Sequence, residues 1–275
     1  MTTLVWDRGG AGAPLLLLHG IGSTIDDFIA VRAALEAEYE VLAVNLPGHG
    51  GSPAMRERPT VAAITDVIAA DLDMLGFSRV HILGNSLGGR IALELARRDR
   101  ALSVVSLAPS GLSLPPERLY QAAGMSMTRL MLRALRPLVG PLARYTPTRA
   151  WMLAGLRSKP WRASEREVLA MRDGFGDSEG FWRLLFWSTL VDVPRGLDEV
   201  RCPVILAQGN HDVVALGQTP RYLLLMPGAT FRPLFGAGHA PMSDTPDAIL
   251  RLVRQATGHA TPSDAGRSSI AAAAG

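Results

Sequence analysis

The sequence predicts an α/β fold, with a mostly parallel twisted sheet that has helices on both faces and a helical segment inserted into it. Short apolar runs alternate with segments of helical periodicity over residues 3–109 and again over residues 203–257. Strands that are apolar along their whole length are typical of parallel sheets buried on both sides. A length of 275 residues and a hydrophobic content of 48% are sufficient for a sizeable core.

The predicted strands follow one another along the whole chain outside the insertion. They are residues 3–7, 15–20, 40–46, 79–84, 103–109, 203–209 and 230–235. Helices are predicted over residues 60–76, 86–98 and 245–257. In the first of these, Val61, Ile64, Ile68 and Leu72 recur at helical spacing and Gly76 ends the pattern.

The alternation stops between residues 112 and 195. This segment is rich in Arg, Met, Pro and Trp, and it is predicted to be mostly helical without a buried strand. We therefore predict a core made of residues 1–111 and 196–257, interrupted by a helical cap over residues 112–195. Residues 258–275 are small and polar and end in an alanine run, which predicts a disordered tail.

Basic residues are concentrated in the inserted segment. It holds 13 basic and 7 acidic residues, a net charge of +6, whereas the rest of the chain holds 15 and 18, a net charge of −3. No acidic residue lies between Glu117 and Glu165. One interpretation of residues 118–164 is an ordinary cap in which leucines face a pocket and arginines face water. The other is a surface that meets an anionic substrate, carrier protein or phospholipid surface.

Several classes of protein and partner are not expected. One cysteine, Cys202, excludes an intramolecular disulfide framework. No pattern of a signal peptide or membrane span is seen, so we expect a soluble cytoplasmic protein. Nucleic acid is not expected, because the basic segment lacks a recognised binding motif and the rest of the chain is acidic. No cofactor or metal ion is expected either, since His211 and Asp212 stand without further ligands at suitable spacing.

Ser86 occupies a place in the sequence that admits two interpretations. It lies between glycines where the predicted strand 79–84 turns into the predicted helix 86–98. Serine is a good helix N-cap, but a nucleophilic serine at such a turn would need a base and a third group that orients the base. Asp212 and His239 each follow a later predicted strand. Because the carboxyl ends of parallel strands meet at one edge of a sheet, these three side chains are expected to lie together.

Three motifs resemble those of the α/β-hydrolase family. Gly84-Asn85-Ser86-Leu87-Gly88 is similar to its nucleophile elbow, His19-Gly20-Ile21-Gly22 to its oxyanion loop after the third strand, and residues 46–52 to the loop after the following strand. The resemblance covers about residues 4–257 and is weakest over 112–195, which corresponds to the variable cap of the family. It implies the α/β-hydrolase fold for this chain.

The resemblance also implies a role for each residue of the motifs. Ser86 would attack a carbonyl carbon, His239 would act as the base, and Asp212 would orient His239. The backbone N–H groups of Ile21 and Leu87 would form the oxyanion hole. The supporting residues would be His19, Gly20, Gly22, Gly84 and Gly88. Side chains at Gly84 and Gly88 are expected to collide in the sharp turn.

The predicted reaction is cleavage of an ester, thioester or lactone of a small, largely apolar acid or alcohol. Ser86 argues against haloalkane dehalogenases and epoxide hydrolases, which use a carboxylate nucleophile. Asn85 is similar to carbon–carbon bond hydrolases of ring-fission products, whereas Ala240-Pro241 resembles ordinary esterases. A carbon–carbon bond hydrolase, a cofactor-free perhydrolase and a non-catalytic ligand-binding protein remain alternatives. The exact substrate and the oligomeric state do not follow from the sequence.

Overall fold

The fold is built on a seven-stranded sheet, and the computed structural model describes residues 3–259 of the chain. The strand order is β1-β3-β2-β4-β5-β6-β7, and every neighbouring pair is parallel except β1 with β3. The strands are β1 (Trp6–Gly9), β2 (Ala13–Leu18), β3 (Tyr39–Val44), β4 (Val80–Asn85), β5 (Ala101–Leu107), β6 (Val204–Gly209) and β7 (Thr230–Leu234). The predicted fold class is confirmed.

The first strand begins later than predicted. The backbone N–H groups of Thr3 and Leu4 donate to the carboxylate of Asp71, at 2.7 and 2.9 Å, and so do not pair with a neighbouring strand. Trp6 Nε1 donates to the same carboxylate at 2.8 Å. The His19–Gly22 motif follows β2, the second strand of the described residues.

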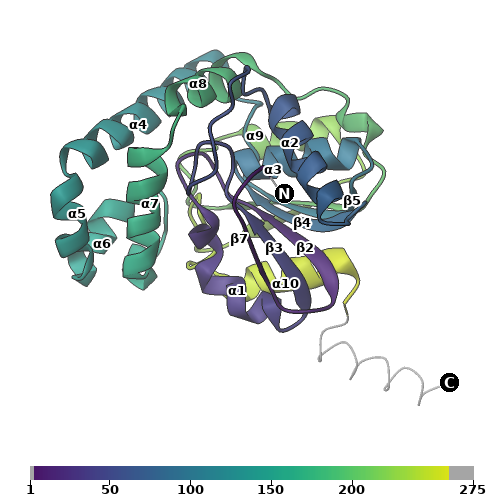
Figure 1. The fold of residues 1–275 in the computed structure, drawn as a ribbon, viewed down its shortest axis with the longest axis horizontal. Coiled ribbons are helices and arrows are strands. Elements are labelled where there is room, and N and C mark those ends of the chain that lie inside the picture. Colours follow the sequence, from purple (N-terminus) through teal and green to yellow (C-terminus); the bar gives the residue numbers. More distant parts are fainter. Residues whose placement is uncertain (1–2, 260–275) are drawn as a thin grey trace.

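Helices cover both faces of the sheet (Figure 1). One face carries α1 (Ile29–Glu36) and α10 (Pro246–Thr257), and the other carries α2 (Val61–Met74), α3 (Leu87–Arg97) and α9 (Gln218–Leu225). Sequence analysis found α2, α3 and α10 but not α1 or α9. Both missed helices have eight residues, and α9 contains Pro220, so their periodicity is too short to stand out.

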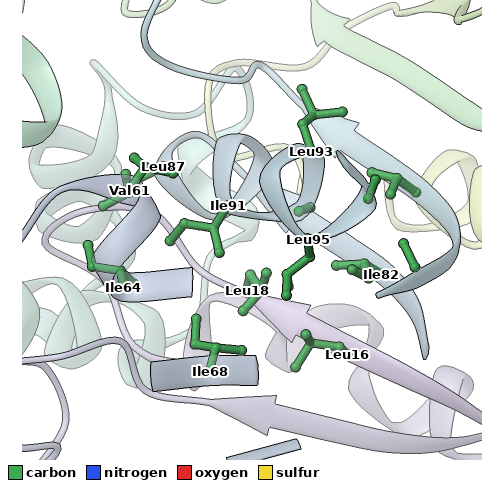
Figure 2. Close-up of a cluster of buried hydrophobic side chains, with 14 of the residues drawn as sticks. Leu16, Leu18, Val61, Ile64, Ile68, Ile82, Leu87, Ile91, Leu93 and Leu95 are labelled. Atoms are coloured by element: carbon green, nitrogen blue, oxygen red, sulfur yellow. The ribbon is translucent and has the colours of Figure 1, made fainter. Parts of the chain in front are cut away.

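The helix that follows Ser86 is fixed by a tight apolar cluster. Ile91 of α3 is fully buried and packs with side chains of β2, β4 and α2. Figure 2 shows these side chains filling the space between the helices and the sheet. The labelled residues are Leu16, Leu18, Val61, Ile64, Ile68, Ile82, Leu87, Ile91, Leu93 and Leu95. The start of α3 is therefore held firmly on the sheet.

Residues 112–195, called the helical segment below, connect β5 to β6 and contain no strand. They lie to one side of the sheet and its helices (Figure 1). Their elements are α4 (Pro115–Ala134), α5 (Arg136–Ala143), α6 (Thr146–Leu153), η2 (Pro160–Arg162), α7 (Glu165–Asp177), α8 (Phe181–Leu185) and the π-helix η3 (Phe186–Val191). These helices share an apolar cluster of their own, which includes Leu132, Val168 and Phe175.

The side chains of residues 129–144 are sorted only in part as an ordinary cap helix would sort them. Leu132 is buried, but Leu130, Leu135 and Leu138 are exposed. Arg129 is buried instead, where it donates to the carbonyl of Phe175 and lies 4.7 Å from the centre of the Phe181 ring. A guanidinium can be buried here because a carbonyl and an aromatic face replace its contacts with water.

The chain end was predicted to be a disordered tail over residues 258–275. Gly258 has a φ of 74° and ends α10, and the His259 ring lies 5.0 Å from the Tyr39 ring. Residues 260–275 lie outside the described residues. Among residues 3–259, no helix is both long and apolar enough to cross a bilayer.

Candidate active site

Ser86 lies between the end of β4 and the start of α3 in a strained backbone conformation. Its φ is 55° and its ψ is −112°, a region that costs a residue with a side chain of order 1–3 kcal/mol. Its side chain makes no capping hydrogen bond to the helix and lies in the cavity described below. The interpretation of Ser86 as a simple N-cap is therefore wrong.

Glycines make this turn sterically feasible. A Cβ atom on Gly84 would lie 2.4 Å from the carbonyl oxygen of Gly88, and one on Gly88 would lie 2.0 Å from that of Leu18. These distances are far inside van der Waals contact, as the sequence predicted for these two positions. On the facing loop, a Cβ on Gly20 would lie 3.2 Å from the Cβ of Ser86. The turn is thus packed directly against the end of β2.

Asp212 and His239 meet at the carboxyl ends of β6 and β7. His239 Nδ1 lies 3.0 Å from Asp212 Oδ2. The other carboxylate oxygen of Asp212 accepts the N–H groups of Val214 and Ala215, at 2.8 and 2.9 Å. The Asp212 side chain is fully buried, so its orientation toward His239 is fixed from both sides.

The two side chains shift each other's pKa in opposite directions. Burial alone would raise the pKa of Asp212, but His239 and the amides of Ala215 and Val214 lower it below its ordinary value. Burial would likewise lower the pKa of His239, yet Asp212, with a smaller contribution from Asp27, raises it. Asp212 is therefore a carboxylate at neutral pH, and the hydrogen bond to Asp212 at Nδ1 leaves Nε2 of His239 available as a proton acceptor.

Ser86 and His239 both line one cavity of about 350 Å³. No hydrogen bond between Ser86 Oγ and the His239 ring is recorded among residues 3–259. Such contacts are often long in enzymes without substrate and shorten in the complex. The cavity is lined on its far side by apolar side chains of the helical segment, including Met131, Leu153 and Phe175.

Ile21 and Leu87 line the same cavity. Within the described part of the chain, neither N–H donates to a backbone or side-chain acceptor. The N–H of Gly22 is different, because it donates to His49 Nε2 at 3.1 Å. These are the two N–H groups to which the family resemblance assigns the oxyanion hole.

His19 and His49 hold the loops around these donors. His19 Nε2 accepts the N–H of Leu46 at 3.0 Å, so Nδ1 carries the proton toward the carbonyl of Gly20 at 2.8 Å. Burial, helped by His49, lowers the pKa of His19 to about 3, and burial lowers that of His49 to about 4. Both rings are neutral and serve as fixed hydrogen-bonding groups. Sequence analysis gave His49 no role, although it lies within the motif at residues 46–52.

The helical segment is hydrogen-bonded to the loop that carries His239. Arg157 Nη1 donates to the carbonyl of Ala240 at 2.8 Å and to Ser243 Oγ at 2.6 Å. The carboxylate of Asp244 accepts the N–H groups of Ser158 and Lys159, each at 2.7 Å, and that of Gly238 at 2.8 Å. Sequence analysis missed the contacts of Arg157, Ser158 and Lys159 because they join positions more than 80 residues apart.

Residues 3–259 contain no group of three or more His, Cys, Asp or Glu side chains that could hold a metal ion. His211 lies beside Asp212 in sequence, but its Nδ1 instead lies 2.6 Å from Ser158 Oγ on the surface. Cys202 is partly buried, and burial raises the pKa of its thiol.

Comparison with known proteins places these features in a family. The model of the alpha/beta hydrolase family matches residues 15–252. Epoxide hydrolase EphH of Mycobacterium tuberculosis is 29% identical over 70% of this chain and 92% of its own length. A dihydrolipoyllysine-residue acetyltransferase component of the acetoin cleaving system of Pseudomonas putida is 35% identical, but the match spans only 38% of this chain and 29% of that protein.

A solved structure agrees with the family match in its fold. The enol-lactonase from Burkholderia xenovorans superposes with a TM-score of 0.73 at 22% identity, over 92% of this chain and 95% of its own. The family model spans nearly the whole described chain, and the elbow, the loops and the strand order accord with it. This chain belongs to the alpha/beta hydrolase family.

Proposed function

We propose that this protein is a serine hydrolase that cleaves a carboxylic ester, thioester or lactone through an acyl-enzyme on Ser86. The observation that carries the proposal is the strained Ser86, whose hydroxyl caps no helix and shares a cavity with His239. The 3.0 Å contact between His239 and the buried Asp212 supports it further. Because residue 86 is Ser and not Asp, the activity named for the epoxide hydrolase relative is not carried over to this chain.

In the proposed mechanism, His239 Nε2 takes the proton of Ser86 as Oγ attacks the carbonyl carbon. Asp212 stabilises the imidazolium that forms. The N–H groups of Ile21 and Leu87 donate hydrogen bonds to the carbonyl oxygen as negative charge develops on it, and the positive end of the α3 dipole adds to this stabilisation. His239 then protonates the leaving oxygen or sulfur, and water attacks the acyl-enzyme with the same base. The mechanism uses no cofactor.

The test is covalent labelling of the full-length protein. A fluorophosphonate probe should modify Ser86, identified by mass spectrometry of the peptides, and Ser86→Ala should abolish both labelling and ester cleavage while the protein stays folded. Ser188→Ala is the matched control, because Ser188 lines the same cavity but donates its hydroxyl to the carbonyl of Leu184. Activity of the Ser86→Ala variant above about a hundredth of wild type would contradict the proposal.

The substrate is proposed to have a small apolar acid or alcohol part. The apolar lining of the cavity supports this choice. A panel of 4-nitrophenyl esters of increasing chain length, tested beside a ring-fission product, separates ester cleavage from the carbon–carbon bond alternative. Failure of Ser86 to react with the fluorophosphonate would instead favour the non-catalytic ligand-binding alternative.

A further inference from the structure

Four polar side chains that the proposed mechanism does not use lie together in the cavity wall. They are Asp27, Asn85, Arg157 and Glu167, called the polar cluster below. Each is at least nine-tenths buried. Asp27 lies in the short helix η1 (Ile25–Phe28), Asn85 ends β4, and the other two belong to the helical segment. The cluster therefore joins both parts of the molecule beside Ser86.

One guanidinium serves two carboxylates in the polar cluster. Arg157 Nη2 lies 2.9 Å from Glu167 Oε1 and 3.7 Å from Asp27 Oδ1, while its Nη1 is already bound to the His239 loop. Glu167 Oε2 accepts the N–H of Ser164 at 2.7 Å. Asn85 Nδ2 donates to Asp27 Oδ2 at a long 3.4 Å. Asp27 thus has only distant partners.

Two acceptors in the polar cluster are poorly served by donors. Among the described residues, Asn85 Oδ1 is buried and has no hydrogen-bonding partner, and the Asp27 carboxylate has only the two long contacts given above; Arg157 Nε is a buried donor that also lacks a partner. Burial is the main cause that raises the pKa of Asp27 to about 6; Arg157 opposes it, and Glu167 adds to it. Buried acceptors without donors are costly, so this arrangement is suited to a donor that arrives with a ligand.

We infer that the polar cluster is a subsite for a hydrogen-bond donor on the substrate, a hydroxyl or an ammonium group close to the carbonyl that Ser86 attacks. The inference rests on the proposed function. Asn85 directly precedes Ser86, and adjacent Cα atoms are about 3.8 Å apart, so the donor belongs within a few bonds of the reacting carbon. A site built to bind a donor discriminates strongly against an analogue that lacks one, because its buried acceptors then stay unpaired.

The test compares substrates that differ only in the donor. Esters carry a hydroxyl, a methoxy or an amino group, or an apolar group of similar size, on C2 or C3 of the acid or on C2 of the alcohol. We expect the hydroxyl or the amino ester to exceed the methoxy ester in kcat/KM by about 10-fold to 100-fold at one of these positions. The amino and hydroxyl arms distinguish a charged donor from a neutral one. Ratios below about 2-fold at every position would overturn the inference.

Variants locate the effect in the polar cluster. Asn85→Leu and Asp27→Asn should each bring the donor-to-methoxy ratio close to one. Thr128→Val removes a hydroxyl from another part of the same cavity and should keep the ratio. Each donor-to-methoxy ratio of kcat/KM is measured within one variant, so a general loss of activity cancels. If neither variant folds, the wild-type panel of esters decides alone. Equal cleavage of all esters contradicts the subsite only, whereas absence of acylation at Ser86 contradicts the proposed function.

Discussion

The sheet and the helical segment form opposite walls of the cavity, and they tolerate change differently. On the sheet side, a Cβ atom on Gly84 or Gly88 would lie within 2.4 Å of a backbone atom of another residue. In the helical segment, Gly174 is packed as tightly against the backbone of Gly22, but Gly124 and Gly155 have nothing within 4 Å. The segment also carries 14 of the 23 exposed large hydrophobic side chains of residues 3–259. We therefore expect the sheet side to tolerate substitution less than the open parts of the helical segment.

The largest effect is expected on the sheet side at Asp212. Asp212→Asn keeps the shape but allows the wrong tautomer of His239, so kcat should fall by about 10³–10⁴-fold. Asp212 also raises the pKa of His239, so the acid limb of the kcat/KM profile should move to lower pH in the variant. Steady-state kinetics from pH 5 to about 9 measure both effects. Wild-type activity in the variant would show that Asp212 does not orient His239.

A matched pair of glycine substitutions tests the comparison directly. Gly88→Ala places a methyl group 2.0 Å from the carbonyl oxygen of Leu18 and should cost at least about 4 kcal/mol of unfolding free energy. Gly124→Ala, in the open part of α4, should instead stabilise by about 0.5–1 kcal/mol. Urea denaturation of both variants measures the difference. Similar losses in the two would show that the segment is packed as rigidly as the sheet.

An intermediate effect is expected at Asp27, where the two walls meet. Its pKa is raised from 3.8 to about 6 in the folded state, so the native protein retains a proton that the unfolded chain has lost, and stability falls as pH rises through this window. The amide of Asp27→Asn does not titrate, so the variant does not lose stability in this pH window. The stability of the variant relative to wild type should grow by about 3 kcal/mol between pH 4 and 6 and stay constant above. A difference that does not change with pH would contradict the interpretation.

The smallest effect concerns the exposed arginines of the helical segment. If they meet an anionic substrate, KM for an acyl-coenzyme A thioester should rise between about 0.1 and 0.5 M salt, while KM for a neutral ester of the same acid should not. Arg133→Gln combined with Arg136→Gln should remove this salt dependence, whereas Arg232→Gln, on β7, should not. An equal response of both substrates to salt would leave the arginines as a solvated face.

Much of the sheet wall could be predicted, because its signals are local. Apolar runs predicted all seven strands, and the glycines around Ser86 predicted the sharp turn. The predicted residues Asp212 and His239 also meet as expected from strand order. Asp27, Arg157 and Asp244 could not be found in this way. Their partners lie far away in the sequence, and a basic stretch reads as a surface even when one of its arginines is buried.

The grip of Arg157 on the His239 loop limits how far this protein can be treated as two exchangeable modules. Its two hydrogen bonds, to Ala240 and Ser243, come from the segment that would be replaced in a chimera. A transplanted segment must supply a guanidinium at the same place, together with backbone amides for Asp244. Residues 156–159 should therefore be kept whenever the helical segment is exchanged with that of a relative. Libraries that randomise the segment should also leave these residues unchanged.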